Sequence, residues 1–394
     1  MVQLYLILII DSFLLQPFRR VFGFIMRFMW TMPPIVAPAP LREPEEETLK
    51  HLHGLAVERL GTLGRTIHGQ GENSAKFLGM LYAATGDEAE WQRTLALVRD
   101  DGTMHRNLCP QEDDDPICAD EAAGFVLAVW RRLPDMTVEE RQKLGRLWHN
   151  TTFRGFPFLL PDGRRGKKLF STGHFWRPWW LLGSEDSLSA MTWLLLGQQI
   201  TGLRRYSVAY TLFTCLQCIG NTFACPDGQF WRGKYYGMTS FNTHSKVLIF
   251  FVGYQLAKHR LGKSFFFSSL KQAYQRHGEY NADIRILAGS VLGEAYHTLA
   301  LELLQSCANK GAKPCPTDKE YISLLWPPAR VMRASCIWPP DCRGGDYVWE
   351  RNPVKGCVYS ETQRRARGLD LIFPVLIMEE LQARGLDASV RQGE

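Results

Sequence analysis

The stretch that decides the fold is LYAATGDEAEW, residues 81–91. The apolar side chains before it recur every three or four positions, which is the spacing of one face of a helix. Thr85-Gly86-Asp87 then interrupts the pattern, and helical spacing resumes at Trp91. A glycine at a helix end supplies the left-handed conformation that ends the helix, and a short connection returns the next helix antiparallel. The stretch therefore predicts a helix hairpin.

The same hinge occurs a second time, about 115 residues further along the chain. The sequence QITG, residues 199–202, ends one apolar helix and leads into Tyr206 and Tyr210 of the next. A series of such hairpins has to bury one stripe of every helix. A closed ring with inner and outer helices satisfies this requirement, and an open solenoid is the other solution.

Helical spacing covers most of the remaining chain. Thr137 with Glu140, and Thr317 with Glu320, have the spacing of a capping box that begins a helix. No segment of comparable strength predicts a strand. About twelve helices are expected, at residues 49–63, 77–85, 91–98, 120–133, from 137 onward, 184–201, 204–216, 243–258, 265–277, 282–307, 317–325 and 369–384.

Composition limits the classes of function. An apolar share of 45% and a charged share of 22% are those of a globular protein. The formal net charge of +6 is modest for 394 residues, and the densest basic cluster is Arg364, Arg365 and Arg367. The chain contains no recognisable nucleic-acid-binding module, so we expect no nucleic-acid partner.

Residues 1–44 are set apart from a domain of residues 45–394. Two apolar stretches near the start are broken by Asp11, by Arg27 and by the pair Pro33-Pro34. Neither reaches the roughly 20 apolar residues of a membrane-spanning helix. The order of basic, apolar and small residues is an imperfect signal-peptide pattern. We expect an exported or membrane-tethered protein, with membrane contact through the N-terminus; the alternative is a cytoplasmic one.

Cysteine spacing does not predict a metal site. Cys215 and Cys218 have the spacing that opens many zinc sites, but no second pair or nearby His completes one. The two residues lie one helical turn apart in an apolar run, which favours buried thiols. No metal and no cofactor are therefore expected.

Three segments carry a resemblance to a known family. They are the acidic run of residues 113–121 that leads into a helix, residues 241–244 (FNTH) that open another, and residues 349–353 (WERNP) near the end. Together with the repeated hairpin they resemble the (α/α) toroid proteins that include six-hairpin glycosidases. The resemblance covers about residues 48–385. It implies an all-α toroid of about six antiparallel helix hairpins, with long loops at one rim.

The resemblance also locates candidate catalytic residues at Asp120 and Glu121. In many toroid relatives this helix begins with a Ser-Arg-Asp-Gln type of sequence at the mouth of the cavity, whereas residues 118–121 here are CADE. Glycoside hydrolysis commonly uses two carboxylates, one as acid and one as base or nucleophile. The structural alternative is that acidic residues stabilise a helix N-terminus. A calcium site is a third reading of the same acidic segment.

Further candidates would bind the substrate. His174, Trp176 and Arg177 lie in a long loop, where rings stack on sugars and a guanidinium binds a carboxylate. The alternative is a lid packed against the rim. Trp349 and Arg351 lie in the non-periodic stretch 326–358. They would line an anionic pocket or, alternatively, satisfy loop carbonyls.

His244 and Lys246 begin a predicted helix, where an inner helix would direct them into the cavity. His244 would then serve as a general base or a substrate ligand. The alternative is a solvent-exposed or capping histidine.

These observations predict a carbohydrate-binding toroid that is also a glycoside hydrolase if its carboxylates are catalytic. A carbohydrate or another small molecule is the expected ligand. The first alternative is a non-catalytic structural or binding component of the cell envelope. The second is a terpenoid cyclase, in which the acidic run of residues 113–115 would face an apolar cavity.

Overall fold

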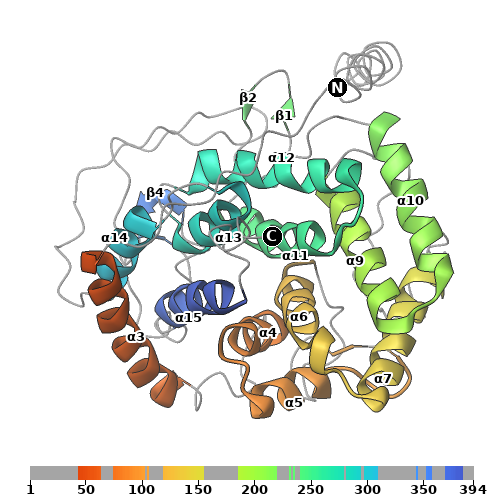
Figure 1. Ribbon diagram of the computed structural model, residues 1–394, viewed down its shortest axis with the longest axis horizontal. Helices are drawn as coiled ribbons and strands as arrows, with labels where there is room; N and C mark the ends of the chain where they lie inside the picture. The colour runs from red at the N-terminus through yellow and green to blue at the C-terminus, as the bar shows by residue number, and fades with distance from the viewer. Residues whose placement is uncertain are drawn as a thin grey trace.

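The computed structural model is predominantly helical (Figure 1), as the sequence predicts. It describes residues 43–63, 74–102, 104–105, 119–154, 185–219, 230–231, 234–235, 240–278, 281–293, 297–308, 343–344, 352–356 and 369–384. The helices are α3 (Glu43–Leu63), α4 (Ser74–Thr85), α5 (Glu88–Ala96), α6 (Ala119–Arg132), α7 (Val138–His149), α9 (Glu185–Thr201), α10 (Arg204–Ile219), α11 (Ser240–Leu256), α12 (Arg260–His277), α13 (Ala282–Leu292), α14 (His297–Ala308) and α15 (Leu369–Ala383).

Short irregular helices and strands complete the described elements. A 3-10 turn, Leu133–Asp135, follows α6, and a π turn, Asn150–Arg154, follows α7. Two antiparallel strand pairs occur, β1 (Phe230–Trp231) with β2 (Lys234–Tyr235) and β3 (Arg343–Gly344) with β4 (Asn352–Gly356).

Each predicted helix among the described residues has an observed counterpart, although α3 and α12 begin six and five residues earlier than expected. Two predictions differ more from the structure. The single helix expected over residues 282–307 is two helices, because Gly293 ends α13 with a φ of 71°. The third helix ends at Ala96, and Val98 instead pairs with Met104 in an isolated bridge. The helix expected at residues 317–325, with its capping box, lies outside the described residues. The division at residue 44 stays a prediction, and α3 begins at Glu43, one residue before it.

Both predicted hinges are observed and share one hydrogen-bond pattern. Thr85 Oγ1 donates to the Leu81 carbonyl at 2.9 Å and accepts from the Asp87 amide at 3.2 Å. Thr201 Oγ1 donates to the Gly197 carbonyl at 2.6 Å and accepts from the Leu203 amide at 3.2 Å. The glycine after each threonine is left-handed, with φ values of 69° and 67°. The threonine and the glycine together end each helix and reverse the chain.

Five helices contact one another in a closed cycle. α4 packs on α6, α6 on α11, α11 on α13, α13 on α15, and α15 on α4. In Figure 1 these helices lie towards the middle of the molecule, with α3, α5, α7, α10, α12 and α14 around them. α9 lies beside α11 and connects it to α7 and α10.

The inner helices run in the same direction. Near their starts, α11 contacts α4, α9 and α13 through side chains in their first two turns. Near their ends, the Arg131 guanidinium of α6 donates to the Ala83 carbonyl of α4 at 2.7 Å and pairs with Glu380 of α15 at 2.9 Å. The amino-terminal ends of these helices therefore lie together at one side of the domain.

Two glycines bring α4 and α6 into backbone contact. A Cβ atom on Gly124 would lie 2.0 Å from the carbonyl oxygen of Lys76, and one on Gly79 would lie 2.3 Å from the carbonyl of Gly124. Real Cβ contacts are never this short, so any other residue here would separate the two helices. Their spacing in the sequence gives no warning of this contact, because Gly79 and Gly124 are 45 positions apart.

This contact predicts opposite effects for two Gly→Ala substitutions. Gly124→Ala should lower the free energy of unfolding by roughly 2–3 kcal/mol or more, because the added methyl group meets backbone atoms. Gly54→Ala in α3 has nothing within 4 Å of its new Cβ. It should raise stability by roughly 0.5–1 kcal/mol through helix propensity. Urea unfolding measures both; equal midpoints for the two variants would contradict the close contact.

Candidate functional site

A cluster of buried polar side chains lies where α4, α11 and α13 begin. Lys76 Nζ donates to Ser245 Oγ at 2.9 Å, and His244 Nε2 lies 2.7 Å from Asp283 Oδ2. Lys76 and His244 are 0% exposed, Ser245 is 1% exposed and Asp283 is 4% exposed. Ionisable side chains are rarely buried so completely unless they are paired or functional. We call Lys76, His244, Ser245 and Asp283 the amino-end cluster.

Local sequence positions each member of the cluster. Lys76 is the third residue of α4, and His244 and Ser245 are the fifth and sixth of α11. Asp283 is the second residue of α13. The Asn281 side chain caps this helix, because its oxygen accepts a hydrogen bond from the Ile284 amide at 3.2 Å. Because the three helices start at the same side, residues 169 and 39 positions apart come within hydrogen-bond distance.

A second lysine extends the cluster towards α9. Lys246 Nζ donates to Ser189 Oγ at 3.4 Å, and both residues are buried. Further along the same two helices, Thr192 Oγ1 donates to the Ile249 carbonyl at 3.2 Å. The start of α9 is thus held against α11 by polar contacts.

The electrostatics of the cluster centre on Asp283. Burial raises its pKa from 3.8 to about 8, although the positive charge of Lys76 acts in the opposite direction. At 2.7 Å a proton lies between Asp283 and His244, carried by the imidazole or by the carboxyl group. Burial therefore keeps the Asp283 carboxyl group protonated to a higher pH than an exposed carboxyl group. The Ser245 hydroxyl accepts from Lys76 and still carries its own proton for a further acceptor.

The helix that begins with the two residues predicted to be catalytic starts at the same side of the domain. Asp120 and Glu121 are the second and third residues of α6, although their side chains are outside the described set. One turn further on, Gly124 touches the backbone of Lys76. The start of α6 therefore lies beside the start of α4 and the amino-end cluster.

The structure places the predicted binding residues unevenly. His244 and Lys246 both lie in α11, so the helix expected there is confirmed. The exposed or capping alternative for His244 is wrong, because the ring is fully buried one turn inside the helix and bonded to Asp283. The remaining predicted binding residues lie outside the described part of the chain: His174, Trp176, Arg177, Trp349 and Arg351.

Sequence reasoning missed Lys76 and Asp283. A signal for Lys76 was present in the sequence, since residues 77–84 (FLGMLYAA) are apolar on every side of the helix and leave no polar face for a lysine. Asp283 gave no usable signal. An acid in the first turn of a helix is ordinarily explained by the helix dipole.

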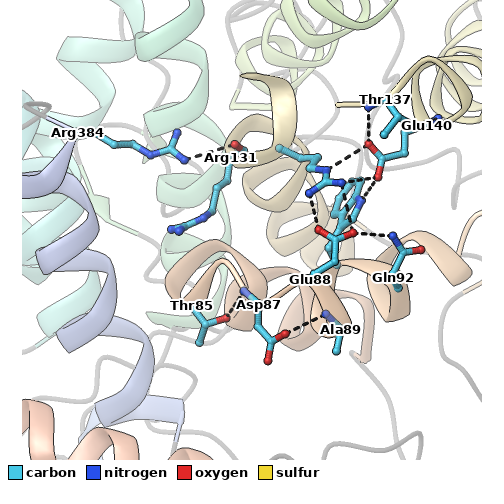
Figure 2. Close-up of polar contacts among 11 residues, drawn as sticks. Thr85, Asp87, Glu88, Ala89, Gln92, Arg131, Thr137, Glu140 and Arg384 are labelled. Carbon is cyan, nitrogen blue, oxygen red and sulfur yellow. Dashed lines mark hydrogen bonds and ion pairs between the residues drawn. The ribbon is translucent and has the colours of Figure 1, made fainter. Parts of the chain in front are cut away.

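A second polar network lies near the carboxyl-terminal end of the inner helix α6, away from the amino-end cluster (Figure 2). The Glu140 carboxylate accepts from the Thr137 amide at 2.8 Å, from Arg132 at 2.9 Å and from the Trp91 indole. Arg132 also pairs with Glu88 at 2.6 Å. Thr137 and Glu140 form the predicted capping box of α7. The network joins α5, α6 and α7, and its groups bond to one another, so we assign it a structural role.

The same side of the domain carries the contact that joins α15 to α6. Arg384 Nη2 donates to the Arg131 carbonyl at 3.4 Å, as Figure 2 shows, and its guanidinium lies 5.3 Å from the Trp130 ring. Arg384 also bonds Glu380, which pairs with Arg131. These contacts hold α15 against α6.

Other expectations concern thiols, metals and membranes. Cys215 is free and exposed, so the prediction of a buried thiol there is wrong; it lies on the outer face of α10. Within the described ranges no group of three or more His, Cys, Asp or Glu side chains could hold a metal ion. None of the helices that the structure describes is both long and apolar enough to cross a bilayer.

Comparison with known proteins adds no family assignment. The chain matches no protein-family model, no curated protein and no solved structure. Functional inference therefore rests on the residues and contacts described above.

The network around Glu140 predicts a large loss of stability on substitution. Burial favours the neutral carboxyl group, but hydrogen bonds from Arg132 and Trp91 outweigh it and lower the pKa of Glu140. Glu140→Gln should cost roughly 2–4 kcal/mol at neutral pH, because it leaves Arg132 with a weaker partner in a half-buried position. Since the pKa is lowered, this contribution is present above pH 4.5 and is lost as the pH falls further.

Exposed Glu139 on the same helix is the matched control, and Glu139→Gln should change the unfolding midpoint little. Urea unfolding at pH 7 and at acid pH measures both variants. Equal losses for the two would show that the network adds no stability.

The amino-end cluster predicts the opposite pH dependence. A carboxyl group whose pKa is raised contributes stability that is fully present below its unfolded pKa of 3.8 and is lost as the pH rises towards 8. Between pH 5 and pH 8 the wild type should therefore lose stability relative to Asp283→Asn, which has no such group. Asp135→Asn, at an exposed position, should follow the wild type at both pH values. A constant difference between wild type and Asp283→Asn would contradict the raised pKa of Asp283.

Proposed function

We propose that the chain is an (α/α) toroid that binds a carbohydrate at the amino-terminal ends of its inner helices, where Asp120 and Glu121 act as the acid and base of glycoside hydrolysis. The observation that carries the proposal is the amino-end cluster. It brings a His-Asp pair, a lysine and a serine to the side of the domain at which α6 begins with the two carboxylates.

The order of the helices supports the ring. Inner helices α4, α6, α9, α11, α13 and α15 alternate along the chain with outer helices α3, α5, α7, α10, α12 and α14. Among the described helices this alternation makes six pairs, of which five contain a helix of the closed cycle and one pairs α7 with α9. Six is the number that the resemblance implies. The cycle of inner contacts closes through α6 and α11, which leaves α9 beside the ring rather than between them.

The lengths of the connections support a rim with long loops. Connections from an inner helix to the next outer helix are short, as at residues 86–87, 202–203 and 257–259. Connections from an outer to an inner helix are long in five of the six cases, at residues 64–73, 97–118, 155–184, 220–239 and 309–368. All long connections thus lead into the amino-terminal ends of inner helices. Long connections positioned by a rigid scaffold commonly carry function.

The predicted binding residues belong to these long connections. His174, Trp176 and Arg177 precede α9, and Trp349 and Arg351 precede α15. Each segment ends where an inner helix begins, so both connect to the side of the domain that carries the amino-end cluster.

A carbohydrate fits this chemistry better than an apolar substrate does. The described side chains at this end are hydrogen-bonding groups, with His244, Ser245 and Lys246 on one helix. These groups are buried and bonded to one another, so they would support a polar site from behind rather than contact the sugar directly. Polar surroundings of this kind suit a sugar, which carries many hydroxyl groups, better than they suit the apolar cavity of a terpenoid cyclase.

Release of reducing ends from a broad polysaccharide panel tests the proposal. The wild type should release them, and Asp120→Asn with Glu121→Gln should abolish release while leaving the fold intact, because both carboxylates are needed. The matched control carries the same two chemical changes at exposed sites, Asp135→Asn with Glu139→Gln, and should retain activity.

Affinity electrophoresis on the same panel separates binding from cleavage. If the wild type binds a polysaccharide but releases no reducing ends, the non-catalytic alternative, a binding or structural component, would be favoured. Neither binding nor release by the folded protein would contradict the proposed function altogether.

A further inference from the structure

Charge is distributed unevenly along the chain. Residues 187–278, which include α10, α11 and α12, contain ten Lys and Arg residues and a single acid, Asp227. The rest of the chain has the opposite balance, with 39 acidic and 36 basic residues. The net positive charge of the whole protein therefore arises from less than a quarter of its length. A segment with this balance favours a negatively charged partner.

Within this segment, α10 has an outward face with large apolar side chains. Val208 and Leu212 are 60% and 56% exposed, and Leu203, directly before the helix, is 44% exposed. Arg204 and Arg205 in the first turn are exposed as well. We call Leu203, Arg204, Arg205, Val208 and Leu212 the α10 face. At 100° per residue its four helical members fall within an arc of about 100°.

The opposite face of α10 packs on the protein. Tyr206, Tyr210 and Thr214 are buried, and α9 is the helix against which α10 packs among the described elements. Figure 1 shows α10 at the edge of the molecule, outside the inner helices. Of six large apolar side chains that are exposed in the described part of the chain, three belong to the α10 face. The concentration on one helix distinguishes this surface from the singly scattered Val57 and Val138.

The chemistry of the α10 face selects one kind of partner. An anionic lipid surface offers phosphates to the arginines and an acyl region to the valine and the leucines, as in interfacial amphipathic helices. A nucleic acid would pair with the arginines but offers little to aliphatic side chains. A second copy of α10 has no acidic residue, since the helix sequence RRYSVAYTLFTCLQCI contains none, and could not pair with the arginines.

We propose that the α10 face docks on an anionic lipid surface, with Arg204 and Arg205 at the phosphates and Val208 and Leu212 at the acyl boundary. This contact is separate from the proposed carbohydrate site, which lies at the starts of the inner helices. It is also separate from the membrane contact predicted for residues 1–44.

Flotation of the full chain with vesicles tests the docking. Vesicles of phosphatidylcholine that also contain phosphatidylglycerol should bind more tightly than phosphatidylcholine alone, and added salt should weaken the binding. Arg204→Gln with Arg205→Gln should weaken it roughly 30-fold, from the contribution of each cation near an anionic surface. Val208→Ser with Leu212→Ser should weaken it roughly tenfold or more. The matched control is Val57→Ser with Val138→Ser, which removes equally exposed apolar groups elsewhere and should bind as the wild type does.

Hydrogen exchange locates the contact independently of any binding by residues 1–44. Peptides that cover residues 203–215 should exchange more slowly with the mixed vesicles, and those of α3 and α7 should be unchanged. Binding without slower exchange of α10 would overturn the proposal, as would equal losses in the two serine pairs or equal affinity for both vesicle types. Equal protection by heparin, a soluble polyanion without acyl chains, would assign the face to a polyanion and overturn the lipid proposal.

Discussion

The approach of α4 to α6 is the constraint on which the rest of the domain depends. Gly79 and Gly124 leave no room for a side chain, so the backbones of two inner helices touch. This contact fixes the start of α6 beside Lys76 and the end of α6 beside Ala83. With those two helices in register, α11 and α15 pack on either side of them, and the cycle of inner contacts closes. Small residues at helix crossings permit such approaches because they remove the only atoms that would separate the backbones.

Polar groups are segregated between the two ends of the inner helices, and they serve different purposes there. At the carboxyl-terminal ends, Glu140 and Arg132 are largely buried and Glu88 is exposed, and charge-assisted bonds among the three offset the desolvation cost. At the amino-terminal ends, Lys76 and His244 are fully buried, and the helix dipoles disfavour positive charge. An arrangement of this second kind costs stability, and it is typical of a site kept for function rather than for folding.

The sequence predicts local structure well, because helix ends are encoded locally. The hinge threonines, the left-handed glycines and the Thr137 capping box all depend on residues within four positions, and all are observed. The single helix expected over residues 282–307 was wrong because Gly293 lies in an otherwise continuous apolar pattern. That pattern outweighed the helix-ending signal of one glycine. An exposed Cys215 was missed because α10 carries apolar residues on both faces, so periodicity could not indicate which face packs.

The candidate site is less predictable, because its members meet through tertiary packing. His244 and Lys246 could be selected from a helix start, but Asp283 and Lys76 become partners only when three separate helices begin at the same side. Burial raises the pKa of the Asp283 carboxyl group, which is hydrogen-bonded to His244. A buried carboxyl group with a raised pKa is an acid near neutral pH, and its imidazole partner is held in one orientation. The chemistry of the amino-end cluster therefore depends on how α4, α11 and α13 pack, and a change at Gly124 would reach the cluster through the backbone of Lys76, although Gly124 itself carries no functional group.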